Sequence, residues 1–196
     1  MSHFETVFRQ IIESPEYLRN IDWGRPRRGH PEGTVRAHIE ELELNLAAFE
    51  GQISPEEYWK LQILIHVHDS FKADAKRGVP ITHPESHASL ARKFLQGITE
   101  DRDLLNMVQY HDEPYALWRQ SQANGSCNRG RLDKLLDCID DWCLFFKFLP
   151  IDGMTYGKSS APLYWAAKQI GRPIGFYSLA LESIKLVEDS RIATAE

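Results

Sequence analysis

The chain has 196 residues, of which 26% are charged, and its formal net charge at pH 7 is -5. This length suits one domain with its own hydrophobic core, and the absence of a basic excess argues against a nucleic-acid-binding protein. No stretch approaches the about 20 apolar residues that span a bilayer, and no leader pattern is present. The cysteines lack C-x-x-C spacing, so we expect reduced thiols and a cytoplasmic protein.

Helical periodicity accounts for most of the chain, and no segment alternates with period two for long enough to be a strand. The pattern predicts helices over residues 3–18, from Thr34, from Ser54 to Lys72, from His83 to Gly97, and over 100–111, 129–148, 160–171 and 174–190. The expected fold class is therefore all-α, a single domain over residues 1–196 with about seven to nine helices.

Two of these helices place histidines on apolar faces. His38 falls on the apolar stripe of the helix that begins near Thr34. The segment Ser54-Pro55-Glu56-Glu57 combines a serine N-cap, a proline at the first helical position and a glutamate at the third, which is a capping box. At the far end of that helix, His68 lies on the side of the preceding leucines, with Asp69 next to it.

Histidines and aspartates on buried faces need an explanation. An isolated buried carboxylate costs several kcal/mol to desolvate, and a neutral imidazole needs partners for both ring nitrogens. One such histidine alone is most simply a hydrogen-bonded core residue or a helix cap. A shared metal ion would satisfy the whole ordered set, which is His38, His68, Asp69, then His83 or His87, then His111, and a final aspartate.

The final aspartate is chosen by its helical face. Asp133, Asp137 and Asp141 are spaced by four residues, which is typical of a solvated row. Asp140 instead aligns with Leu136 on the apolar row. We therefore expect Asp140 to be the ligand, with Asp137 as the alternative.

The order of these residues resembles the HD superfamily, an all-helical group of metal-dependent phosphohydrolases named for its adjacent His-Asp pair. Three local segments resemble the family's H-D-x-x-K, H-P-x-x-G-A and H-H-E motifs: His68-Asp69-Ser70-Phe71-Lys72, His83-Pro84-Glu85-Ser86-His87-Ala88 and His111-Asp112-Glu113. The segment 30–38 is similar to the entry of the HD domain in some nucleotidyltransferases. The resemblance covers residues 30–145, and we expect the C-terminal helices over 158–190 to pack on this core.

The resemblance implies a set of metal ligands, which are His38, His68, Asp69 and Asp140, with His83 or His87 and His111 for a second ion. In that case Asp69 would be the bridging carboxylate. Where the family has a small residue this chain has His87, so either His83 or His87 can be the ligand. Where the family often has a second histidine this chain has Asp112, which leaves one ion or two open. The mixed donors suit Mn, Fe, Co, Ni or Zn, and Mg is also compatible.

The activity that the resemblance implies is phosphomonoester or phosphodiester hydrolysis, on a nucleotide or another small phosphorylated metabolite. Water on the metal, with its pKa lowered, would attack phosphorus. The catalytic candidates are Asp69, Lys72 and Glu113, and the substrate-binding candidates are Lys72, Arg28 and Lys158. Ordinary solvated side chains would explain Glu113 and the cations nearly as well.

Two other classes of protein are compatible with the pattern. Some HD proteins resemble myo-inositol oxygenase and the phosphonate-cleaving oxygenases, which hold two irons and activate dioxygen. A non-catalytic regulatory module is the other, although intact ligands argue against it. We expect a small phosphorylated partner, no membrane and no nucleic acid, and the sequence is compatible with a homodimer.

Overall fold

All regular elements are helical in a computed structural model of the chain, which describes residues 2–27 and 31–195. The only extended pairing among these residues is an isolated antiparallel bridge between Gly24 and Thr34. The α-helices are α1 His3–Glu13, α2 Pro15–Asn20, α3 Val35–Leu46, α4 Pro55–Val67, α5 His87–Gln96, α6 Arg102–Tyr110, α7 Glu113–Asn124, α8 Arg129–Cys138, α9 Trp142–Gly153, α10 Ala161–Ala166 and α11 Tyr177–Ala195. The prediction of an all-α fold is confirmed.

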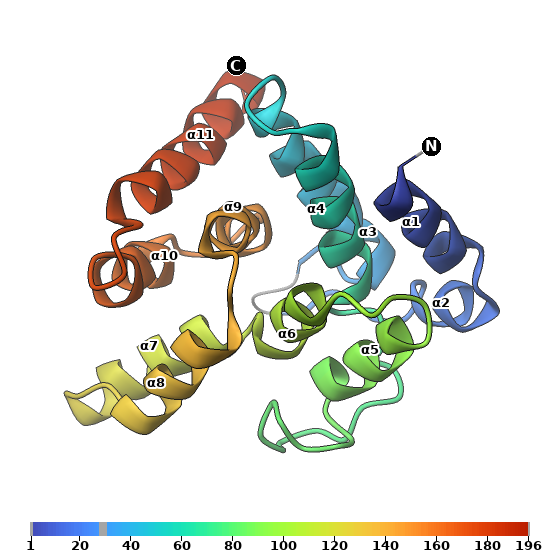
Figure 1. The fold of residues 1–196 in the computed structure, drawn as a ribbon, viewed down its shortest axis with the longest axis horizontal. Coiled ribbons are helices and arrows are strands. Elements are labelled where there is room, and N and C mark those ends of the chain that lie inside the picture. The colour runs from blue at the N-terminus through green and yellow to red at the C-terminus, as the bar shows by residue number, and fades with distance from the viewer. Residues whose placement is uncertain (1, 28–30, 196) are drawn as a thin grey trace.

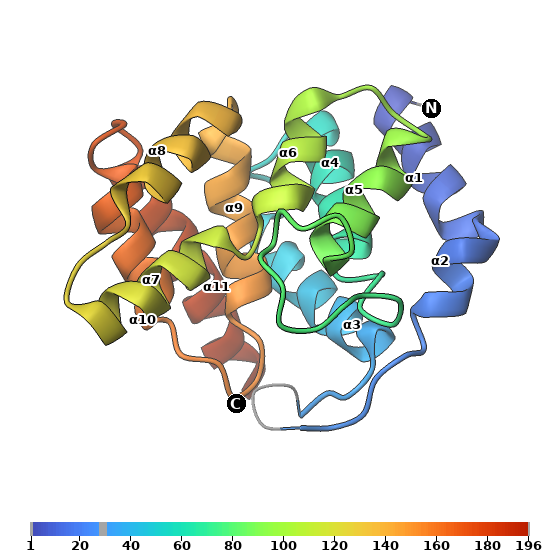
Figure 2. The same ribbon diagram turned by 90° about the horizontal axis from the view of Figure 1, so that it is seen from below.

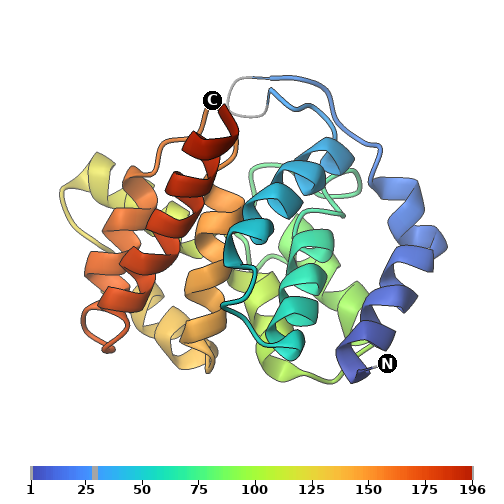
Figure 3. The same cartoon turned by 90° about the horizontal axis from the view of Figure 1, so that it is seen from above.

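Helix α9 lies between two groups of helices. In Figure 2 the helices α1 to α6 lie on one side of α9, and α7, α8, α10 and α11 lie on the other. Helix α9 packs against α11, α3 and α4, and Figures 1 and 3 show the same central position. Buried apolar side chains from Val7 in α1 to Val187 in α11 belong to one hydrophobic cluster. Among the described residues, no helix combines the length and apolarity needed to cross a membrane.

The two helices expected to begin at Thr34 and Ser54 begin where the sequence predicts. The Thr34 hydroxyl accepts the backbone N–H of Ala37 at 3.1 Å and so caps α3. Both hydrogen bonds of the Ser54 and Glu57 capping box are present at the start of α4. Helix α4 ends at Val67 rather than at Lys72, and a series of turns follows.

Two predicted helices are each divided in the structure. The first, over 3–18, is interrupted at Ser14, which caps α2, and Pro15, which is its first residue. Proline has no backbone N–H and disfavours helical backbone before it, so α1 ends at Glu13.

The second division separates α8 from α9 and depends on a distant side chain. The Asp103 carboxylate accepts the backbone N–H groups of Asp140 at 2.9 Å and Asp141 at 2.8 Å. The Asp141 carboxylate in turn accepts the N–H of Leu144 at 2.9 Å, which starts α9. The prediction of one helix over 129–148 is therefore wrong.

Helix α7 has no counterpart in the predicted set. It ends at Asn124 and is followed by Gly125, whose left-handed backbone (φ 70°) is typical of a glycine after a helix. With the two divided helices, this brings the described residues to eleven α-helices, more than the expected seven to nine.

Candidate metal centre

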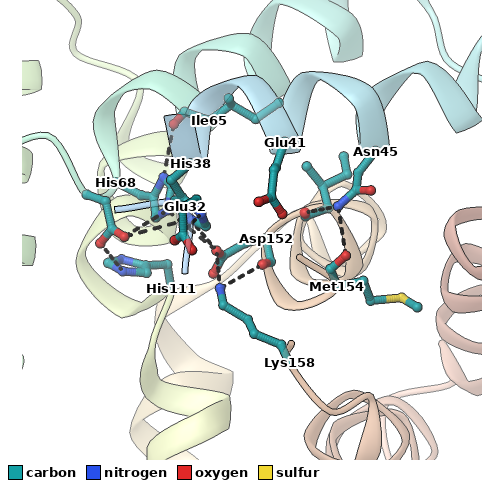
Figure 4. Close-up of polar contacts among 12 residues, drawn as sticks. Glu32, His38, Glu41, Asn45, Ile65, His68, His111, Asp152, Met154 and Lys158 are labelled. Carbon is teal, nitrogen blue, oxygen red and sulfur yellow. Dashed lines mark hydrogen bonds and ion pairs between the residues drawn. The ribbon is translucent and has the colours of Figure 1, made fainter. Parts of the chain in front are cut away.

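His38, His68 and Asp152 converge from three different helices. His38 lies on α3, His68 at the C-terminal end of α4 and Asp152 in the last turn of α9. The Nε2 atoms of His38 and His68 lie 3.1 and 3.7 Å from Oδ1 of Asp152. Both imidazoles are buried, and Figure 4 shows them on one side of Asp152 with Lys158 on the other. We call this set the inner group.

Asp69, His87 and His111 form a second set, which we call the cavity-side group. Asp69 lies in the turn after α4, His87 begins α5 and His111 follows α6. The Nε2 atoms of the two histidines lie 3.3 Å apart, and each lies 3.6 Å from Oδ1 of Asp69. The three residues can therefore hold one cation between them.

Asp69 lies between the two groups. Its Oδ2 atom is 3.5 Å from Nε2 of His68 and 3.9 Å from Nε2 of His38, whereas its Oδ1 atom faces His87 and His111. One buried carboxylate thus presents one oxygen to each group.

The orientation of the histidine rings suits metal binding. A backbone carbonyl can only accept a hydrogen bond, so Nδ1 must carry the proton where it contacts one. Nδ1 of His68 lies 3.0 Å from the carbonyl of Leu64, and Nδ1 of His111 lies 2.8 Å from that of Val108. In the neutral imidazole this leaves the Nε2 lone pair directed at the site, as in most histidine ligands.

Two buried polar atoms at this point make no hydrogen bond to any described residue, namely Nε2 of His68 and Oδ1 of Asp69. Such atoms are costly unless something binds them. Ligand atoms around an ion at about 2.0–2.2 Å lie about 3–3.6 Å apart, depending on the coordination geometry. The interatomic distances in both groups lie at or near this range, so the residues fit divalent cations.

The charges of the site depend on burial and on close partners. Burial opposes ionisation of Asp69, but the Lys72 ammonium and His68 outweigh it and hold the pKa of Asp69 well below its usual range. Burial lowers the pKa of His68 despite the nearby carboxylates. For His111, burial is outweighed by Asp112 and Asp69, which raise its pKa to about 9.

Two further side chains, Lys158 and Glu32, contact the ligands of the inner group. Nζ of Lys158 donates to the Asp152 carbonyl at 3.0 Å and to its Oδ1 at 3.3 Å. Burial opposes ionisation of Asp152, but Lys158 and the histidines outweigh it and keep the pKa of Asp152 well below its usual range. Oε1 of the buried Glu32 side chain lies 3.4 Å from Nδ1 of His38.

The end of α9 is also held against α3. The side-chain amide of Asn45 donates to the carbonyls of Ile151 at 2.8 Å and Met154 at 3.3 Å, as Figure 4 shows. Asn45 is buried, so these bonds are shielded from water. They fix the backbone on both sides of Asp152.

A cavity of about 1100 Å³ opens beside the cavity-side group, and His87 and Asp112 form part of its wall. Its lining contains more cations than acids: Arg25, Arg27, Lys72, Lys76, Arg77 and Arg131, against Asp22, Asp112 and Glu113. Several of these charges are paired: Asp22 with Arg36, Arg131 with Glu113, Lys72 with Asp69 and Lys76 with Glu85. The other lining charges are three arginines, Arg25, Arg27 and Arg77, and one acid, Asp112. The cavity therefore favours an anionic ligand.

His83 and His87 differ in where they lie relative to the start of α5. Ser86 caps this helix, so His87 occupies its first turn and reaches His111. His83 lies in the preceding turn, where its Nδ1 accepts the N–H of Glu85 at 3.1 Å. Of the two candidates, the structure places His87 in the cavity-side group and His83 outside both groups.

The structure does not place Asp140 in either group, because the interruption after α8 turns it outward. Its side chain is exposed, and Oδ2 lies 3.2 Å from a guanidinium nitrogen of Arg102. The alternative, Asp137, is exposed on α8 and belongs to neither group.

The structure places Asp152 in the inner group. Residue 152 lies between the predicted helices over 129–148 and 160–171, so the sequence pattern does not include it among the candidate ligands. A signal was nevertheless present, because Asp152 follows the buried Phe145 and Phe148 by seven and four residues, which is the spacing of one helical face.

The structure places the remaining candidates in different surroundings. Lys72 contacts Asp69 and lines the cavity. Glu113 also lines the cavity but is buried in its ion pair with Arg131, not exposed. Lys158 contacts Asp152 and is not among the residues that line the cavity. Arg28 lies outside the described residues.

Comparisons of the chain with protein-family models, curated proteins and solved structures gave no match. The site itself defines the class of protein at a coarse level: an all-α protein with two adjoining His/Asp groups that can bind metal ions.

Proposed function

We propose that this protein is a metal-dependent phosphohydrolase of the HD type, acting on a nucleotide or another small organic phosphate. The observation that supports this most is the position of Asp69, whose carboxylate joins two His/Asp groups at the wall of a cation-lined cavity. Paired cations that share a carboxylate are a common arrangement for hydrolysis of phosphate esters.

Each group has donors for one divalent ion. His38, His68, Asp152 and Oδ2 of Asp69 would hold the first, and Oδ1 of Asp69 with His87 and His111 would hold the second. Such ions supply an acidified water molecule and polarise a phosphoryl oxygen. The mixed nitrogen and oxygen donors suit a transition metal such as Mn²⁺, Fe²⁺ or Zn²⁺.

Lys72 is the residue best placed to bind the phosphoryl group. Its ammonium contacts Asp69 and lines the cavity. Burial opposes its charge, but Asp69 outweighs burial and raises the pKa of Lys72, so the side chain stays cationic at neutral pH. A fixed cation here stabilises the negative charge that develops on phosphoryl oxygens in the transition state.

The cavity supports a substrate larger than inorganic phosphate. Its volume of about 1100 Å³ is at the upper end for small-molecule sites. The Trp23 side chain in its wall gives an apolar surface for the organic part, and Arg25, Lys76 and Arg77 bring positive charge to other parts of the lining.

The proposal is tested by an anaerobic screen for phosphate release from nucleotides and simple phosphate esters. The enzyme is stripped with chelator and reloaded with Mn²⁺, Mg²⁺ or Zn²⁺. We expect two bound ions per chain and release that Asp69→Ala abolishes. A protein that binds two ions but releases phosphate from no substrate would contradict the proposal.

One observation favours a second candidate, a dinuclear iron oxygenase. The two groups together contain four histidines and two carboxylates, and this set can also hold two irons. The oxygenase would contain iron and consume dioxygen with its substrate, whereas the hydrolase would work without oxygen and with redox-inert ions. Metal content together with an oxygen-electrode assay separates the two.

A further inference from the structure

We propose that Asp112 is a fourth ligand in the cavity-side group, so that this group binds a divalent transition-metal ion through two imidazoles and two carboxylates. The inference rests on the proposed metal centre and adds a residue to it. Asp112 follows His111 directly and forms part of the cavity wall.

Asp112 lies close to both imidazoles of the cavity-side group. Its Oδ2 atom lies 3.4 Å from Nε2 of His87 and 3.6 Å from Nε2 of His111. The two nitrogens lie 3.3 Å from each other, and each lies 3.6 Å from Oδ1 of Asp69. Ligand atoms around one ion at about 2.0–2.2 Å lie about 3–3.6 Å apart. The Asp112 carboxylate is therefore within reach of an ion bound by the two imidazoles.

The backbone of Asp112 leaves its side chain available to the histidines. Asp112 precedes α7 with a helical backbone (φ -83°, ψ -8°), whereas a capping side chain normally belongs to a residue with extended backbone. Its side chain accordingly makes no cap bond to α7. The carboxylate lies against His87 and His111 instead.

The proposal makes the two groups chemically equivalent. The inner group has two imidazoles and two carboxylates when Oδ2 of Asp69 is included. Without Asp112, the cavity-side group would have two imidazoles and only the shared carboxylate. With it, each ion is neutralised to the same extent, although the Asp112 side chain is 46% exposed and the inner ligands are more enclosed.

The test is a metal titration of the full-length, chelator-stripped protein with Mn²⁺ and with Zn²⁺, read by calorimetry. Loss of a residue that only orients a ligand weakens metal binding by about 10–100-fold. We therefore expect Asp112→Asn to weaken the second binding event by at least that factor and to leave the first unchanged. The matched control is Asp140→Asn, which removes an exposed carboxylate that belongs to neither group and should bind like the wild type.

The substitutions at Asp112 are chosen so that the variants still fold. Asp112 makes no cap hydrogen bond to α7, so Asp112→Asn and Asp112→Ser should preserve the start of that helix, which circular dichroism of the metal-free proteins checks. Folded variants that bind two ions with wild-type affinity would overturn the proposal. Wild-type protein that binds two ions without any hydrolase activity would overturn the proposed function only, because the role of Asp112 is measured by binding.

Discussion

The inner group and the cavity-side group share one carboxylate, that of Asp69, but differ in their surroundings. The inner group is enclosed by helices, with Lys158 on Asp152 and Glu32 beside His38. The cavity-side group borders a large cavity, and its His87 side chain is 20% exposed. Enclosure favours slow loss of an ion, whereas an open side allows contact with substrate. Under the proposed function, we therefore expect the inner group to retain its ion and the cavity-side ion to contact the substrate.

The largest effect is expected at Asp69, because it contributes to both groups. Asp69→Ala should remove both ions and reduce turnover to background while the helical content stays intact. Metal analysis after gel filtration, with circular dichroism as the folding control, measures this. A folded variant that retains both ions would show that Asp69 is not a ligand shared by the two groups.

Asp152→Ala is expected to remove the inner ion, because Asp152 contacts both inner histidines. The matched control is Asp140→Ala, which changes an exposed aspartate paired with Arg102 and should retain both ions. Metal content per chain distinguishes them. If Asp140→Ala lost an ion and Asp152→Ala kept both, Asp140 would be the ligand, as the sequence predicts.

His87→Ala is expected to remove the cavity-side ion alone, leaving about one equivalent bound. His83→Ala is its control from the same segment, since His83 bonds only to the local backbone in the described structure. Equal metal loss in the two variants would show that the distinction between these histidines is wrong.

Lys158→Met should have a smaller effect and only on the inner ion. The substitution keeps an aliphatic chain but removes the donor to Asp152, and outer partners of this kind contribute about 10–100-fold in metal affinity. Competition with a chelating dye measures the change. If the substitution weakened binding of the cavity-side ion instead, Lys158 would support that group and not the inner one.

The pH dependence should also distinguish the groups. The pKa of His111 is raised to about 9, so below that pH a proton must leave before the cavity-side group binds metal. Its affinity should fall by about tenfold per pH unit from pH 9 to 7. Burial lowers the pKa of His68, which is already neutral in this range, so the inner affinity should change less. Titrations at pH 7, 8 and 9 measure both slopes, and equal slopes would contradict the prediction.

The parts of the fold that depend on neighbouring residues could be predicted from the sequence. The caps at Thr34 and Ser54 are local features, and the structure contains both. The positions of His38 and His68 on buried faces followed from helical periodicity, and both side chains are buried. The class of fold followed for the same reason.

The errors have nonlocal causes. Nothing near residue 140 indicates that Asp103, in another helix, ends α8 at that point. A continuous helix over 129–148 favours Asp140 by its apolar row and ends before Asp152. The choice between His83 and His87 needed the first residue of α5, which depends on Ser86 rather than on a pattern over several turns.

Asp152 lies 114 residues after His38, and the inner group joins them. An ion held there would act as a cross-link that closes a long loop, and loops of about this size restrict the unfolded chain by about 4–5 kcal/mol in chain-entropy terms. During synthesis this cross-link can form only after α9 has emerged from the ribosome. Metal loading would then be one of the last steps in the maturation of the chain, and it would lock together the helices on both sides of α9.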